Sequence, residues 1–190
     1  MSNTSASGGY LSPLTTVLEG QPLLDFFQAW LVGITSLPPA NVRPRWQREP
    51  GNMPPETADW LAFGIPRRES DVYTAEVHNA SGSGYNETRR HEILHFLVSL
   101  YGPNADLTAQ TLREGMQVMQ NLEVLNLASM GLVDSGEIAT VPELVKDKWY
   151  YRLDLTFRVK RQIVVQYGVE SLASGSVQLN NAIYTTNINV

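Results

Sequence analysis

Apolar residues recur every three or four positions in residues 23–34, and this period predicts an amphipathic helix. Pro22 suits the first turn of such a helix, while Gly33 and Pro38-Pro39 are expected to end it. The apolar positions of this stretch are Leu23, Phe26, Phe27, Trp30, Leu31 and Ile34. We expect them to form one buried stripe.

Two further helices are predicted after residue 103. In residues 104–119, Asn104 or Asp106 can serve as the N-cap. The apolar stripe there consists of Ala105, Ala109, Leu112, Met116 and Met119. A shorter helix, "NLEVLNLASMG", is expected to stop at Gly131. The methionines of this region are interpreted as core residues and not as a partner groove, because an unbranched thioether readily fills gaps in a core.

A strict alternation of apolar and polar residues from Trp149 to Lys160 predicts a β-strand with one buried and one solvated face. The apolar set is Trp149, Tyr151, Leu153, Leu155, Phe157 and Val159. The short segments "ADWLAFGI" and "DVYTAEVHN" are also predicted strands. Gly82-Ser83-Gly84 supplies a flexible hairpin loop, across which residues 72–78 are expected to pair with residues 92–100.

Residues 41–56, "NVRPRWQREPGNMPPE", are rich in proline, which allows an edge strand or a projecting loop and excludes a central strand. Arg43, Arg45, Arg48 and Trp46 resemble a basic patch with an aromatic residue. We interpret them as solvated charges on an edge strand, because the chain as a whole is acidic.

The composition is that of an ordinary soluble globular protein. The 190 residues carry a net charge of -5, which argues against tight, non-specific binding to nucleic acid. The sequence contains no cysteine, so disulfides, thiol nucleophiles and thiolate metal sites are excluded. No leader-like or 18-residue apolar segment occurs, and we therefore expect neither export nor a membrane partner.

The most suggestive local motif is His91-Glu92-Ile93-Leu94-His95, which has the H-E-x-x-H spacing of zinc metallohydrolases. The motif works only on a helix, where residues four apart share one face and two imidazoles can bind one Zn²⁺. On a strand the two histidines would lie about 13 Å apart, and the glutamate would face the other way. The function of the motif therefore depends on the element that contains it.

Periodicity allows both a helix and a strand at residues 91–101. As a strand, alternate residues would be covered on both faces, and the preceding hairpin loop favours this choice. A zinc site would also need a third ligand, for which His78, Glu114 and Glu123 are the available candidates. We therefore interpret His91 and His95 as strand histidines that contact a neighbour or solvent, and we predict no metal site.

Other catalytic or cofactor motifs are missing from the sequence. It has neither a G-x-S-x-G elbow nor a glycine-rich phosphate loop, and its carboxylates show no recognisable acid/base pair. We therefore predict no catalytic residues, no cofactor and no enzymatic activity.

Four blocks of sequence, taken together, resemble the neck (tail) terminator family of tailed bacteriophages. They are "DWLAFGI", "ETRRHEILHFLVSLYGP", "LREGMQVMQNLEVLNLASMGLV" and "PELVKDKWYYRLDLTFRVKRQIVVQY". Their order and spacing carry the resemblance from about Asp59 to Tyr167, with the helix near residues 22–33 as a looser extension. In that family the segment equivalent to "HEILHFLVSLYG" is a strand, which would make the H-E-x-x-H spacing accidental.

The resemblance implies an α/β (α+β) domain, in which an antiparallel sheet is flanked by helices, that assembles into a ring, expected to be a hexamer. Such a ring would be a structural virion protein made in the host cytoplasm. Its partners would be the head-tail connector and the tail tube or another tail protein, and genomic DNA would pass through it without specific binding. The alternatives are another small tail-completion or baseplate protein, and a zinc metallohydrolase that uses His91, Glu92 and His95.

The expected domain organisation has three parts. Residues 1–15 form a flexible N-terminal arm, residues 16–165 the terminator-like domain, and residues 166–190 an extended C-terminal arm. The C-terminal segment is polar with scattered apolar residues, so it cannot form a core alone and is expected to become ordered on a neighbour.

Overall fold

The structure, a computed structural model, describes the chain except for residues 1–2, 50, 146, 172–176, 180–181 and 185–190. The chain divides into two compact units. The core unit comprises residues 18–72 and 91–162, and the terminal unit comprises residues 1–17, 73–90 and 163–190. The domain boundaries expected near residues 15 and 165 stay a prediction.

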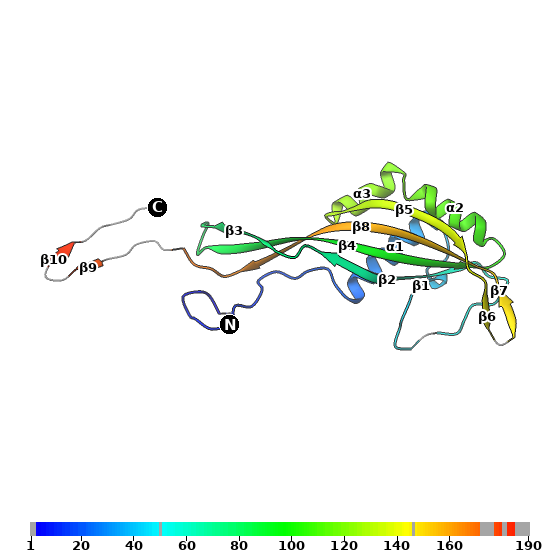
Figure 1. Cartoon of the computed structure of the whole chain (residues 1–190), viewed down its shortest axis with the longest axis horizontal. Coiled ribbons are helices and arrows are strands. Elements are labelled where there is room, and N and C mark those ends of the chain that lie inside the picture. Colours follow the sequence, from blue (N-terminus) through cyan, green and yellow to red (C-terminus); the bar gives the residue numbers. More distant parts are fainter. Residues whose placement is uncertain (1–2, 50, 146, 172–176, 180–181, 185–190) are drawn as a thin grey trace. The chain divides into compact units, whose positions relative to one another are not determined.

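The main sheet is mainly antiparallel, and its principal strands follow the order β1-β2-β4-β8-β5 (Figure 1). Their bounds are Val42–Pro44 (β1), Trp60–Ser70 (β2), Tyr85–Tyr101 (β4), Met130–Thr140 (β5) and Arg152–Tyr167 (β8). The β2–β4 and β5–β8 pairs are antiparallel, whereas the short, proline-containing β1 runs parallel to β2 at one edge. An edge position suits β1 because Pro44 has no N–H to donate.

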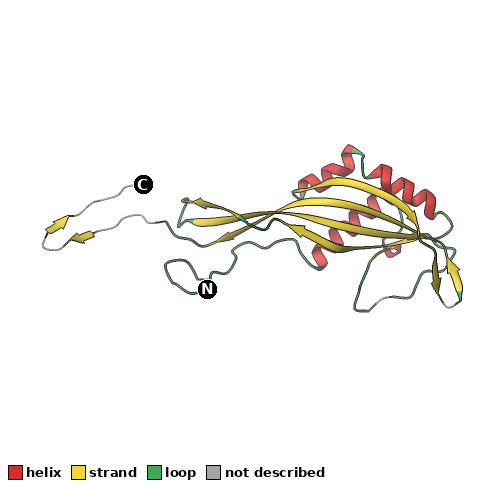
Figure 2. Cartoon of the chain, in the orientation of Figure 1, coloured by secondary structure: helices red, strands yellow, loops and turns green. Residues whose placement is uncertain are grey.

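Three α-helices lie in the described part of the core unit, and they are shown in red in Figure 2. They are α1 (Gln21–Thr35), α2 (Ala105–Gly115) and α3 (Met119–Leu127), and a short 3-10 helix, η1 (Pro39–Asn41), follows α1. The predicted fold class, an α/β protein with an antiparallel sheet and helices, is confirmed. The predicted helix at residues 23–34 is confirmed as well, with Pro22 in its first turn.

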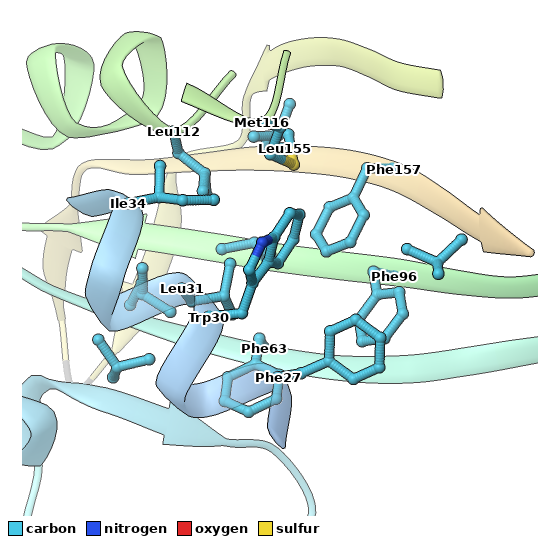
Figure 3. Packing of buried hydrophobic residues seen from close by; sticks show 14 of the residues in the cluster. Phe27, Trp30, Leu31, Ile34, Phe63, Phe96, Leu112, Met116, Leu155 and Phe157 are labelled. Carbon is cyan, nitrogen blue, oxygen red and sulfur yellow. The ribbon is translucent and has the colours of Figure 1, made fainter. Parts of the chain in front are cut away.

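Aromatic side chains form the centre of the core between the helices and the sheet. Phe27 and Trp30 of α1 point toward Phe96 of β4 and Phe157 of β8 (Figure 3). The rings of Phe96 and Phe157 are stacked with their centroids 4.6 Å apart, and Phe27 lies 4.3 Å from Phe96. The Trp30 Nε1–H donates a hydrogen bond to the Asn121 carbonyl of α3, so its buried polar atom is satisfied.

Helix ends differ from the sequence-based expectation. Helix α1 continues through Gly33 to Thr35 and ends at Ser36, which has a left-handed backbone with φ of 56°. Helix α2 ends at Gly115, and Met119 begins α3 with its side chain exposed. The expected end at Gly131 was wrong, because α3 stops at Leu127 and Gly131 belongs to β5. Met116 and Met130 are core residues as expected, but Met119 is not.

The strand predicted from residue 149 begins later in the structure. Trp149 lies in β7 (Lys148–Tyr150), which pairs with β6 (Glu143–Val145) in a separate hairpin. Trp149 and Tyr151 are exposed, so their inclusion in the buried face was wrong. From Arg152 the alternation holds, and Leu153, Leu155, Phe157 and Val159 are buried.

The hairpin around Gly82-Ser83-Gly84 is present in the terminal unit, but its strand pairing differs from the prediction. Strand β3 (Ala75–Asn79) pairs with residues 85–89 of β4, whereas residues 92–101 pair with β2. A tight hairpin pairs the residues that are nearest to its loop, which the predicted pairing ignored.

Residues 3–17 of the terminal unit lie against the end of β8. The Leu14 N–H donates to the Gln166 carbonyl at 2.7 Å, and the Ser5 N–H donates to the Gly168 carbonyl at 3.0 Å. Strands β9 (Val177–Leu179) and β10 (Ala182–Tyr184) pair with each other. The predicted C-terminal arm lies in part outside the described residues.

Candidate functional site

The H-E-x-x-H residues lie on strand β4, as the interpretation of His91 and His95 required. Glu92 is buried on the helix-covered face of the sheet, whereas His91 and His95 are on the opposite face. Positions four apart on a strand are separated by about 13 Å, which is too far for two imidazoles to bind one ion. The spacing in the sequence therefore does not produce the zinc geometry.

Both histidines of the motif, His91 and His95, have an acidic neighbour from β2 or from the turn after it. His91 Nδ1 lies 3.2 Å from Asp71 Oδ2, and His95 Nε2 lies 3.1 Å from Glu69 Oε1. The His95 contact does not have hydrogen-bonding geometry. Within the described ranges, no group of three or more His, Asp or Glu side chains could hold a metal ion. Glu114 and Glu123 are on α2 and α3, and His78 is in the terminal unit.

Glu92 is instead part of a buried ion-pair cluster with Arg161 of β8. The Arg161 Nε–H donates to Glu92 Oε2 at 2.7 Å, and its Nη1–H donates to the Leu18 carbonyl at 2.7 Å. Arg161 also pairs with Glu19, which in turn pairs with Arg68. Burial alone would raise the pKa of Glu19, but hydrogen bonds from Arg68 and Arg161 lower that pKa below its usual value. The cluster fixes the chain entering α1 onto the sheet.

The face of the sheet opposite the helices is open in the core unit. We call it the open face. The core side chains of β4 and β8 all lie on the helix side, whereas Ile93, His95 and Leu97 of β4 are only half-buried. The expectation that β4 is covered on both faces was therefore wrong, because the helices of the core pack on one face only.

A polar network crosses the open face near the end of β4. The Ser99 hydroxyl donates to Asp154 and accepts from the Arg45 guanidinium, although its neighbours on β4 are apolar. Arg152 donates two hydrogen bonds to the Asp154 carboxylate, at 2.9 and 2.7 Å. Burial would raise the pKa of Asp154, but the hydrogen bonds from Arg152 and Ser99 outweigh burial and lower it.

Farther along the same face is a hollow of about 510 Å³. Leu97, Gly136 and Thr156 line it, and it is flanked by Arg67, His95 and the Arg158–Asp134 ion pair. The hydrogen bond from Arg158 lowers the pKa of Asp134. A side chain cannot replace Gly136, because a Cβ there would lie 2.6 Å from Thr156 Oγ1. Gly136 therefore contributes no side chain to the hollow.

Arg43 and Arg45 are not freely solvated, which corrects part of the sequence-based interpretation. The Arg43 guanidinium donates to the Ala40 and Asn52 carbonyls, and Arg45 reaches Ser99 across the sheet. Arg48 and Trp46 are exposed. The Trp46 ring covers Gly64, where a Cβ would lie 2.5 Å from it. These residues help to hold the edge of the sheet and do not form a continuous basic patch.

Aromatic residues line a second hollow, of about 240 Å³, at the end of the sheet. The rings of Trp60 and Tyr101 stack 4.2 Å apart, and Trp149 and Tyr151 lie beside them. Burial, together with the nearby Glu143 carboxylate, raises the pKa of the Tyr101 hydroxyl. Sequence analysis missed this cluster because it joins residues that are distant in the chain.

Helix α3 exposes an apolar ridge. Leu127 is 89% exposed and Met119 is 71% exposed, and Val124 is also exposed. Leu125 of the same helix is buried in the core. Large apolar side chains that are exposed together on one helix mark a surface that contacts other proteins, so this surface is expected to have a partner. Of these three residues, only Met119 was predicted to lie in the core, and the sequence-based prediction assigned no location to Val124 or Leu127.

Open sheet faces and exposed apolar helices are features of subunits that function by packing against other proteins, which places the chain in the class of assembly proteins. The family model described as "Phage neck terminator protein" matches residues 21–183, and the chain belongs to this family. A comparison with curated proteins found no match. The suspected family is thereby confirmed.

Family membership makes the protein a structural component of the neck of a bacteriophage particle, where it interacts with other head or tail proteins. Membership of a structural family also argues against enzymatic activity. Over the described part of the chain, no helix has the length and apolar character to cross a membrane.

Proposed function

We propose that the protein forms a ring, expected to contain six copies, between the head-tail connector and the tail, and that genomic DNA passes through the centre of the ring. The observation that carries the proposal is the match to the neck terminator family over residues 21–183. A neck subunit has to join two structures end to end, and a closed ring can do so while leaving an axial passage.

The charge of the chain supports the proposed passage of DNA. A channel that bound phosphates tightly would hold the genome, whereas a chain with a net charge of -5 repels a polyanion weakly. We also propose that residues 166–190 act as an arm that becomes ordered along a neighbouring protein. Intact rings and infectious particles from a chain that lacks this arm would overturn the second proposal.

The position in the particle can be tested by tagging the chain and locating the tag in reconstructed particles. Density at the head-tail junction, as a closed ring around the DNA, is the expected result. Density at the baseplate would contradict the proposal and would favour the alternative of a baseplate protein. A gel-shift measurement with double-stranded DNA should show no stable complex at physiological salt.

A further inference from the structure

The core unit has two surfaces of complementary character on opposite sides. The α3 ridge (Met119, Val124 and Leu127) consists of exposed apolar side chains on one of the helices that cover the sheet. The hollow at Leu97, Gly136 and Thr156 is concave and lies on the open face. The two surfaces belong to the same unit and share no residue, so in a series of identical copies each copy could use its ridge at one contact and its hollow at the next.

The geometry of the hollow suits an apolar side chain at its centre. Its floor combines Leu97 with a glycine and a threonine, and its rim carries the Arg67–Glu69 and Arg158–Asp134 ion pairs. A small apolar centre with a charged rim is the usual anatomy of a protein-protein interface. A leucine or methionine from another molecule would lose exposed apolar area there without removing these ion pairs from water.

The charges around the two surfaces are also complementary. Glu123 lies between Met119 and Leu127 on the ridge side of α3 and is exposed, and Glu114 of α2 is exposed nearby in the sequence. At the hollow, Arg67 pairs with Glu69 and Arg158 pairs with Asp134, so these charges balance. The net positive charge of this part of the open face comes from Lys160, which is exposed two residues beyond Arg158 on β8. Opposite net charges favour the encounter of the ridge with the hollow over the encounter of two ridges.

We propose that the α3 ridge of one copy docks into the open-face hollow of the next copy, forming the head-to-tail contact of the ring. This inference rests on the proposed ring, and it names the surfaces that build it. Such a contact is heterologous, so each copy contributes one ridge and one hollow, and the series closes when the rotation per copy divides a full turn.

The proposal can be tested with two variants that each remove one half of the contact. Leu127→Lys places a charge on the ridge, and Thr156→Arg fills the hollow. Native mass spectrometry should show that the fraction of protein in rings falls at least about tenfold in each variant alone, as expected for central interface residues. An equal mixture should regain dimers, because one copy keeps its hollow and the other its ridge. Leu144→Lys, on the exposed β6–β7 hairpin, is the matched control and should retain the ring.

Cysteine pairs give a direct readout of proximity, since the natural chain has no cysteine. Leu127→Cys protein mixed with Thr156→Cys protein should form a disulfide-linked dimer, whereas Leu144→Cys with Thr156→Cys should not. Rings that persist in both charge variants, without the cross-link, would overturn this inference and leave the proposed ring intact. A wild-type chain that stays monomeric would overturn both. Circular dichroism checks that each variant is folded.

Discussion

Single side chains in this protein determine which parts of the sheet can be buried. Arg161 is 4% exposed and Glu92 is 5% exposed, yet both lie on the apolar side of the sheet. Each charge is tolerated there because the other neutralises it and because the Leu18 carbonyl and the Glu19 carboxylate accept further hydrogen bonds from the guanidinium. The cluster thus makes the position of α1 depend on two charged residues.

Removing Arg161 should therefore destabilise the fold strongly. Arg161→Ala leaves the Glu92 carboxylate buried without its partner, and the expected loss in the free energy of unfolding is about 3–5 kcal/mol. Urea denaturation measures it. The matched control is Lys148→Ala, whose ion pair with Glu56 is largely exposed and should cost less than about 1 kcal/mol. Equal losses in the two variants would refute this role of the cluster.

Replacing Gly102 or Gly33 by alanine should have opposite effects on the stability of the protein. Gly102 has a φ of +108°, and a Cβ there would lie 2.5 Å from Asp59 Oδ1, so Gly102→Ala should cost at least about 1–3 kcal/mol. Gly33 is helical with no atom near its missing Cβ, and Gly33→Ala should stabilise the protein by about 0.5–1 kcal/mol. Thermal denaturation of both variants checks the signs, and a stabilised Gly102→Ala protein would contradict the account.

Asp154 should contribute to stability in a defined pH range. Its pKa is lowered in the folded protein, so the unfolded chain binds its proton first as the pH falls. The stabilisation is fully present above the ordinary aspartate pKa of about 3.9 and is lost as the pH falls through the lower folded value. As the pH falls below about 4, the melting temperature of Asp154→Asn should therefore fall less steeply than that of the wild type. Parallel curves would exclude this role of Asp154.

At the scale of elements, strand β4 separates two functions on its two faces. Phe96 packs between Phe27 and Phe157 in the core, whereas its neighbour Leu97 lines the hollow on the open face. The first face holds the subunit together, and the second is available to a partner. The alternation of side chains along one strand is sufficient for this division.

Alanine substitutions on the two faces of β4 should have separable effects. Phe96→Ala removes a fully buried ring and should lower the free energy of unfolding by about 3–5 kcal/mol. Leu97→Ala should cost less than half of that in dilute, monomeric protein. Urea denaturation at low protein concentration is the appropriate measurement. A larger loss for Leu97→Ala would contradict the assignment of the two faces.

Sequence patterns predicted the elements better than their ends and partners. The apolar stripe of α1 and the alternation from Leu153 to Val159 were sufficient to predict the type of each element and its buried face, because the local period of apolar residues reflects burial on one face. The apolar period near Met119 was misleading, because Met119 continues the stripe of α2 although the helix breaks at Gly115. The placement of H-E-x-x-H on a strand was correct, but the pairing of β4 with β2 depends on residues that are far apart in the chain.

The candidate site was predictable only in part. His91 and His95 could be placed as strand residues, and Arg45 could be singled out as a cation near an edge strand. The Ser99–Asp154 and Arg161–Glu92 contacts could not be predicted, since each joins residues more than 50 positions apart in the sequence. The open face could not be predicted either, because the sequence does not indicate that all the helices pack on the same side of the sheet.

At the scale of the whole molecule, the chain is a subunit whose exposed features gain a function in an assembly. The exposed α3 ridge and the open sheet face would be poor surfaces for an isolated monomer, because both leave apolar area in contact with water. A ring in which the ridge of each copy meets the open face of the next would cover both. The phage neck terminator family provides the biological setting for such a ring.

The most direct test of the central claim is native mass spectrometry of the purified wild-type chain in the presence of zinc. The account predicts a metal-free species with six copies of the 21.1-kDa chain. A chain that remains monomeric at every accessible concentration would contradict the proposed ring. A stoichiometric zinc adduct that disappears in His95→Ala would contradict the interpretation of H-E-x-x-H and would restore the hydrolase alternative.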